Sequence, residues 1–167
     1  MLEPAAFKAR FMAAPGWAEE PFERYDESLL RDAGIDAQAI RLLVDVGLPR
    51  EVALTGNFVA LDTDGLEAWH AAGLPAHHFP IGSNGGVSFF VIAPESGRVL
   101  KLSSNWERTE LVNSSVAQFA ESLCLFAEYA EADQWAQFVE RISKIDAPAA
   151  HVGSHWRELA DDLLSLP

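Results

Sequence analysis

The chain is nearly free of cysteine. Among its 167 residues it has one, Cys124. A single cysteine excludes an intramolecular disulfide and a cysteine-based zinc site. Because Cys124 lies between Leu123 and Leu125 in a segment with helical periodicity, we expect it to be a small buried hydrophobic residue.

Basic residues are also scarce: 12 lysines and arginines stand against 25 aspartates and glutamates, which gives a formal net charge of −13. This charge argues against binding to nucleic acid, whose phosphates would be repelled, and against binding to an anionic membrane surface. It permits a basic protein partner, which long-range electrostatic steering would attract. Solubility alone also explains an acidic composition, and the charge does not separate these two interpretations.

The chain lacks a long hydrophobic run, because no apolar stretch reaches the roughly 20 residues of a membrane-spanning helix. Its N-terminus carries Glu3 where a secretory signal would be basic. We therefore expect a cytoplasmic protein that begins with a short amphipathic helix, with Phe7 and Phe11 on one face. The composition, 49% hydrophobic with five Trp and ten Phe, is typical of one globular domain.

Motifs for phosphate or calcium binding are incomplete. Gly82, Gly85 and Gly86 lie between two predicted strands, whereas a phosphate-binding loop connects a strand to a helix. The GSNGG stretch is therefore predicted to be a hairpin turn. The sequence DTDG at 62–65 begins like a calcium loop, but its glycine comes at the fourth position instead of the sixth. We predict an ordinary turn there.

Metal ligands and catalytic groups are equally sparse. His70, His77 and His78 are close in the sequence, but adjacent strand residues point to opposite faces. His151 and His155 are four residues apart, with no second pair of ligands to complete a site. The chain has no G-x-S-x-G motif for a serine nucleophile. We therefore predict no catalytic, metal-binding or cofactor-binding residue.

The hydrophobic periodicity predicts an α+β fold, with helices, then a small antiparallel sheet, then helices. Predicted helices are 26–34, 36–47, 113–132, 133–145 and 155–166, and predicted strands are 53–61, 77–82, 87–93, 98–104 and 109–113. Pro80 favours an edge position for its strand, and Gly97 suits a left-handed turn position. The strand 87–93 is apolar on both faces, which indicates a central strand covered on both sides. The segment 65–75 is predicted to be irregular or a short helical turn.

Several short segments occur in a family-specific order. They are VGLP at 46–49, Gly97-Arg98-Val99, Val112-Asn113-Ser114-Ser115 with Phe119 and Leu123, and Ile145-Asp146 with Trp156. In this order they resemble the SUKH superfamily, in particular its fourth subgroup of bacterial immunity proteins. The resemblance covers about residues 25–164, and it departs from the family pattern at Ala147, where the proline comes one place late. We expect a helical segment and connection over 1–24, followed by one SUKH-like domain over 25–167.

The resemblance implies an immunity protein that binds and neutralises a cognate toxin domain and is not an enzyme. The acidic balance suits a basic, nuclease-type toxin domain. The matching residues are structural, so the family supplies no toxin contacts. Two other readings stay open: a protein-binding adaptor on the same scaffold, and a small enzyme with a deep polar pocket. The sequence does not predict the oligomeric state.

Candidate toxin contacts follow from charge and aromatic character. They are Asp62, Asp64, Glu67, Trp106, Glu107 and Glu110. The first three cluster near one predicted loop, and the others follow the predicted hairpin. An exposed tryptophan surrounded by acids is a plausible binding hot spot. The alternative is that Trp106 lies in the core and the acids are merely solvated.

Overall fold

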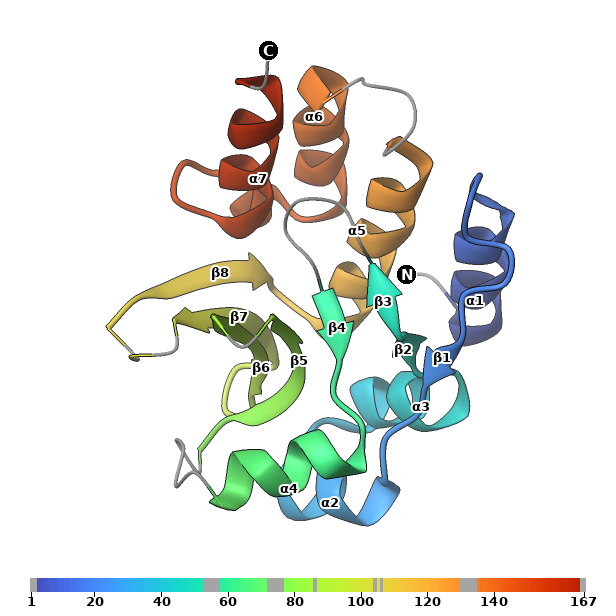
Figure 1. Cartoon of the computed structure of the whole chain (residues 1–167), viewed down its shortest axis with the longest axis vertical. Helices are drawn as coiled ribbons and strands as arrows, with labels where there is room; N and C mark the ends of the chain where they lie inside the picture. The colour runs from blue at the N-terminus through green and yellow to red at the C-terminus, as the bar shows by residue number, and fades with distance from the viewer. Residues whose placement is uncertain are drawn as a thin grey trace.

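The computed structural model describes residues 3–52, 58–71, 77–85, 87–103, 105, 107–129 and 135–165. In these ranges an antiparallel meander is surrounded by helices, which confirms the predicted α+β class (Figure 1). The larger sheet contains, in spatial order, β3 (Glu51–Val52), β4 (Phe58–Ala60), β5 (Phe79–Asn84), β6 (Ser88–Ala93), β7 (Arg98–Ser103) and β8 (Thr109–Asn113). A separate two-stranded sheet pairs β1 (Phe22–Glu23) with β2 (Leu48–Pro49).

Helices precede and follow the larger sheet in the sequence, and one of them, α4, lies between two of its strands. They are α1 (Pro4–Ala13), α2 (Glu27–Asp32), α3 (Ala37–Asp45), α4 (Thr63–Ala71), α5 (Val116–Tyr129), α6 (Trp135–Ile145), the 3-10 helix η1 (Ala147–Ala150) and α7 (His155–Leu164). Most of them begin at a residue that the sequence already marks. Asp26 and Asp36, for example, accept hydrogen bonds from the first backbone N–H groups of α2 and α3.

The sheet buries both of its faces where β6 runs. Phe90 and Ile92 point into the main core, which they share with Phe119 of α5. Val91 points to the other face and packs with Trp69 of α4 in a second, smaller cluster. Since β6 lies between β5 and β7, the prediction of a central strand covered on both sides is confirmed.

The N-terminal helix α1 is part of the main core. Phe7 and Phe11 are fully buried and make edge-on ring contacts with Phe22, at centroid distances of 5.5 and 5.7 Å. This confirms the predicted amphipathic helix. Cys124 of α5 lies 3.5 Å from the Phe7 carbonyl oxygen, and burial raises the pKa of its thiol to about 12. Cys124 is therefore the buried, unreactive residue that was expected.

Two turn predictions are confirmed in part. Gly97 adopts φ +68° between β6 and β7, as the hairpin requires. Gly85, with φ +53°, turns the chain between β5 and β6, while Gly86 lies outside the described residues. The predicted strand over 53–61 appears as β4, and residues 53–57 also lie outside the described ranges.

Two predictions are wrong. The strand around Pro80 is internal, between β4 and β6. It holds a proline because β4 pairs only with Gly82 and Ser83, so Pro80 itself has a partner on β6 alone. The DTDG turn is instead the start of α4, since Asp62 Oδ1 accepts the Gly65 N–H at 2.9 Å and so caps a helix. The helix α4 runs through much of the segment that was predicted to be irregular or a short helical turn.

Candidate functional site

Four of the residues that carry the family resemblance, Asn113, Ser114, Asp146 and Trp156, meet in one buried hydrogen-bonded network. Asn113 is fully buried, and its Nδ2 donates to Ser122 Oγ at 3.1 Å and to Asp146 Oδ2 at 3.2 Å. Its Oδ1 accepts the Trp156 Nε1–H at 2.9 Å. The backbone N–H and the hydroxyl of Ser114 donate to the two carboxylate oxygens of Asp146 at 2.6 and 2.9 Å.

This network joins the end of β8 to α5, to the start of η1 and to α7. Every polar side-chain atom of Asn113 and Asp146 has a partner in it, as buried polar groups require. We therefore assign these residues to the scaffold, where they hold the C-terminal helices on the sheet.

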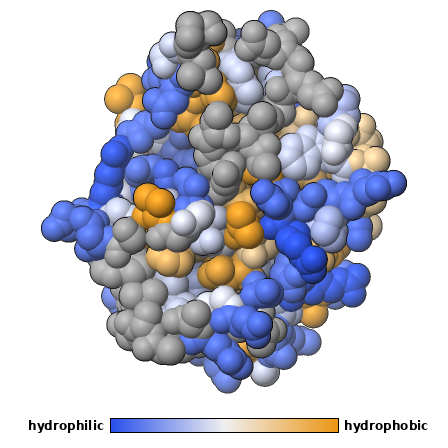
Figure 2. All heavy atoms as spheres, in the orientation of Figure 1, coloured by the Kyte–Doolittle hydropathy of each residue, from blue (hydrophilic) through white to orange (hydrophobic). Residues whose placement is uncertain are grey.

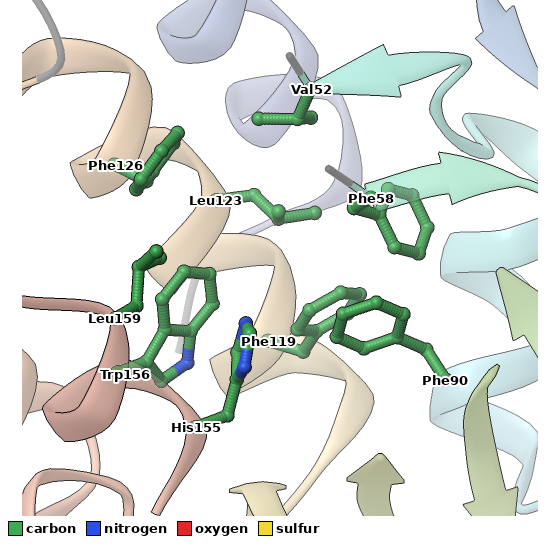
Figure 3. Close-up of a pocket in the computed structure, with 9 residues that line it drawn as sticks. All are labelled: Val52, Phe58, Phe90, Phe119, Leu123, Phe126, His155, Trp156 and Leu159. Atoms are coloured by element: carbon green, nitrogen blue, oxygen red, sulfur yellow. The ribbon is translucent and has the colours of Figure 1, made fainter. Parts of the chain in front are cut away.

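A narrow apolar cavity lies beside this network (Figure 3). Its lining residues are Val52, Phe58, Phe90, Phe119, Leu123, Phe126, His155, Trp156 and Leu159. The cavity volume is about 10 Å³, which is enough for one water molecule at most. In Figure 3 the His155 imidazole stands between Trp156 and Phe119. Burial and the nearby positive charge of Lys101 lower the pKa of His155 to about 3, so this ring is neutral at physiological pH.

The predicted contact Glu110 belongs to a network of charges at the end of the sheet. It is 8% exposed, and its carboxylate lies 3.5 Å from Lys101 Nζ and 3.1 Å from Arg108 Nε. Arg108 also contacts Glu158 of α7 at 2.6 Å. The charge of Glu110 is therefore compensated by two cations of the same chain.

Glu107 lies next to this network and is exposed, and its carboxylate accepts a hydrogen bond from Asn105 Nδ2 at 2.8 Å. Trp106 lies outside the described residues, so the choice between an exposed and a buried tryptophan is untested. As toxin contacts, all three hairpin candidates stay predictions.

The other three candidates, Asp62, Asp64 and Glu67, are exposed along α4. Asp62 caps the helix, and none of the three forms an ion pair within the ranges that the structure describes. Their charges are thus left to solvent. They too stay predictions as toxin contacts.

A cleft with a volume of about 280 Å³ lies between α2 and α4, and Asp62 is on its rim. We call it the α2–α4 cleft; its lining residues are Arg24, Tyr25, Asp26, Ser28, Leu29, Leu61, Asp62 and Leu66. Sequence reasoning did not connect α2 with α4. The signal that could have suggested it is that an aspartate precedes each of these helices, but nothing in the sequence places the two helix starts together.

The six predicted contacts do not form one patch. In Figure 1 α4 begins close to α2, toward the lower right, whereas the connection between β7 and β8 lies at the left edge. Figure 2 shows hydrophobic residues in the middle of this face of the molecule and mainly hydrophilic ones around them. The structure therefore separates the α4 acids from the hairpin acids.

A third cleft, of about 600 Å³, lies where α3, α5 and α6 approach one another. Its polar side chains are largely engaged within the chain. Gln118 Nε2 donates to the Ile145 carbonyl oxygen at 3.0 Å, and Lys144 pairs with Glu140 at 2.7 Å. This cleft combines both signs of charge and favours no particular ligand.

In the part of the chain that the structure describes, the histidines form no metal site, but one expectation about them is wrong. His77 and His78 precede β5 instead of alternating along it, and their rings are in contact, with centroids 4.4 Å apart. His151 is exposed while His155 is buried, and the side chain of His70 lies outside the described part of the chain. Across the described ranges, no group of three or more His, Cys, Asp or Glu side chains is placed to hold a metal ion. Among the same residues, the helices are too short or too polar to cross a bilayer.

The meander sheet and the buried network that ties α5, η1 and α7 to it define an α+β domain of the SUKH type. The family model of the SUKH-4 immunity proteins matches residues 9–162. Because this match covers most of the chain, the protein belongs to the SUKH-4 immunity protein family. Neither a search of the curated proteins nor a search of the solved structures returned a match.

Proposed function

We propose that this protein neutralises a cognate bacterial toxin in the cytoplasm by binding a basic, nuclease-type toxin domain through an acidic surface. Membership of the SUKH-4 immunity family supports the toxin-binding role. The net charge of −13 supports a basic partner. The observation that carries the choice of surface is the set of exposed acids at the start of α4, Asp62, Asp64 and Glu67, of which Asp62 also lines the α2–α4 cleft.

The proposed mechanism requires no chemistry by the immunity protein itself. Exposed acids that lack cations of their own attract a basic domain over a distance of about one Debye length, roughly 8 Å at physiological salt. Apolar contacts then hold the complex, because charge complementarity contributes more to association rate and specificity than to affinity. In the complex, the immunity protein would cover the basic surface with which a nuclease binds its nucleic acid substrate.

The test is to express the toxin domain encoded next to this gene, with and without the immunity protein, and to follow growth and complex formation. We expect full rescue by the native chain, together with a stable complex. A triple variant, D62N/D64N/E67Q, should lose most of the rescue while remaining folded. The matched control is E19Q/D162N/E3Q, which removes three exposed acids from other regions. Equal rescue by the two variants would contradict the choice of surface.

A protein-binding adaptor on the same scaffold is the second candidate function. It is supported by the fact that the motif residues Asn113, Asp146 and Trp156 are bound to one another inside the fold. They specify the scaffold and leave the choice of partner to the surface. An adaptor would form complexes with a host protein and would leave toxicity unchanged in the growth experiment.

A further inference from the structure

The α2–α4 cleft has an apolar interior. Tyr25 and Leu66 are 4% and 5% exposed and form its floor, while Leu29 is 40% exposed on its wall. The Tyr25 hydroxyl donates to the Ile81 carbonyl oxygen, and burial raises the pKa of this phenol well above its usual value. The Tyr25 phenol is therefore neutral, and its hydroxyl already has a hydrogen-bond partner within the chain. Leu29 presents apolar surface to solvent.

The mouth of the cleft carries two carboxylates that are held in place by the helices they cap. Asp26 Oδ1 accepts the N–H groups of Ser28 and Leu29, at 2.8 and 3.1 Å. Hydrogen bonds from Ser28 and from the Leu29 N–H lower the pKa of Asp26, so it is ionised at neutral pH. Asp62 Oδ1 is held in the same way by the Gly65 N–H. In both aspartates the capping hydrogen bonds are accepted by Oδ1.

The charges around the cleft are predominantly negative. Asp64 and Glu67 follow on α4, and Glu27 on α2 is paired with Arg31. The opposing charge is Arg24, which is exposed and lines the cleft. A cleft lined by both leucines and carboxylates matches a side chain that has a long aliphatic stem and a cationic end.

We propose that the α2–α4 cleft receives one lysine or arginine side chain from the surface of the toxin domain. The aliphatic stem lies against Leu29 and Leu66, and the cation lies between the carboxylates of Asp26 and Asp62. This inference rests on the proposed function, because it assigns the side chain to the toxin. Charge complementarity between the cleft and a basic partner selects this occupant over a purely apolar one.

The cleft itself can be tested without the toxin. Amide chemical shifts of the full chain are followed by NMR while Nα-acetyl-arginine N-methylamide is added, and then the lysine and citrulline analogues. Citrulline has nearly the shape of arginine and no charge. We expect saturable shifts centred on Ser28, Leu29, Gly65 and Leu66 with both cationic probes, and much weaker binding of the citrulline probe. Equal shifts with citrulline, or shifts spread evenly over the acidic surface, would overturn the proposal.

Charge variants sharpen this titration because the helix caps can be kept. Asn is also a good N-cap, so D26N/D62N removes two charges and retains both helix starts. Binding of the arginine probe should weaken about tenfold in this variant, as expected for loss of close charge pairs. The R24Q variant should bind the same probe more tightly. The control E19Q/D162N should leave the affinity unchanged, and a similar loss in this control would contradict a specific cleft.

The toxin assay then decides whether the toxin uses the cleft. The L29K variant places a lysine in the cleft, where it would compete with the toxin side chain for the two carboxylates. The affinity for the toxin domain should therefore fall at least about tenfold. The matched control is V152K, at a residue that is 92% exposed in the connection before α7. Unchanged binding by L29K and by D26N/D62N would overturn the cleft as the toxin contact while leaving the immunity function intact. Failure of the native chain to rescue growth would instead overturn the proposed function.

Discussion

Acidic residues lie both where the chain enters β8 and at the start of α4, but only those near β8 include a carboxylate that is paired with cations of the same chain. Glu110 lies between Lys101 and Arg108, and Arg108 continues to Glu158. Asp64 and Glu67 on α4 form no ion pair within the described ranges.

This difference separates acids that support the fold from acids that are available to a partner. A carboxylate that already has two cations beside it adds little to the field outside the molecule. An uncompensated carboxylate on a helix surface adds its full charge to that field, at little benefit to stability. We therefore expect substitutions of buried or ion-paired acids to change the free energy of unfolding. Substitutions of the exposed acids on α4 should instead change binding to the toxin domain.

The largest effect is expected at Asp146, the carboxylate deepest in the buried network. In D146A the Nδ2 group of Asn113 and two groups of Ser114 lose their acceptor in an environment that excludes water. The free energy of unfolding should fall by about 3–5 kcal/mol, because each buried donor left without an acceptor costs about 1–3 kcal/mol. Urea denaturation measures this, and a loss below about 1 kcal/mol would contradict the scaffold role.

A smaller effect is expected from acidification, through the buried imidazole of His155. Its pKa is about 3 in the folded protein and near 6.5 in the unfolded chain, so the unfolded state binds more protons between these values. Its contribution to stability is complete above about pH 6.5 and decreases by about 1.4 kcal/mol per pH unit below that. Between pH 6.5 and 5 the loss should be about 2 kcal/mol.

The matched variant for this prediction is H155F, because phenylalanine keeps the ring contacts with Phe90 and Trp156. Its stability should change much less over the same pH range. The comparison is best made above pH 5, where most surface carboxylates are still ionised. If the free energy of unfolding depended on pH equally in the native chain and in H155F, a group other than His155 would be responsible for the pH dependence.

The hairpin acid Glu110 should give a smaller change. In E110Q the shape is kept, but Lys101 and Arg108 lose their shared counter-charge. We expect a loss of about 1–2 kcal/mol in the free energy of unfolding and a much smaller loss of toxin affinity than in the α4 variants. Calorimetric titration with the toxin domain checks the second part. If E110Q weakened binding as much as the α4 variants, the distinction between the two regions would fail.

The smallest stability effect is expected on α4. D64N/E67Q should change the free energy of unfolding by less than about 0.5 kcal/mol, because these are exposed surface sites. The same variant should slow association with the toxin domain and make it less sensitive to salt. Stopped-flow mixing at two ionic strengths measures both. An association rate equal to that of the native chain would remove α4 from the interface.

Much of the fold could be predicted from the sequence, because periodicity and caps are local properties. The spacing of apolar residues identified α3, α5 and α6, and the alternation identified β6 and β7. The start of α4 was missed because DTDG suits a turn as well as a helix cap, and the packing of Trp69 against Val91 favours the helix. The internal position of β5 was missed because the sequence does not show that the short strand β4 pairs only with Gly82 and Ser83 and ends before Pro80.

The candidate site was less accessible to sequence reasoning. Charge alone identified Asp62 and its neighbours on α4, but Tyr25 and Leu29 come more than 30 residues earlier, and only the folded chain brings them to the same cleft. The motif residues Asn113, Asp146 and Trp156 were recognised by their order. That they meet in one network depends on how α6 and α7 return to β8, which spacing does not specify.

The packing of α1 also determines when this protein can fold during its own synthesis. Phe7 and Phe11 are buried against residues that include α5, more than 100 positions later in the chain. At roughly 5–20 residues per second the ribosome needs several seconds or more to add that stretch. The ring contacts of Phe7 and Phe11 with Phe22 can form early, but α1 packs against α5 only after most of the chain has been made. Until then part of its apolar face is available to chaperones.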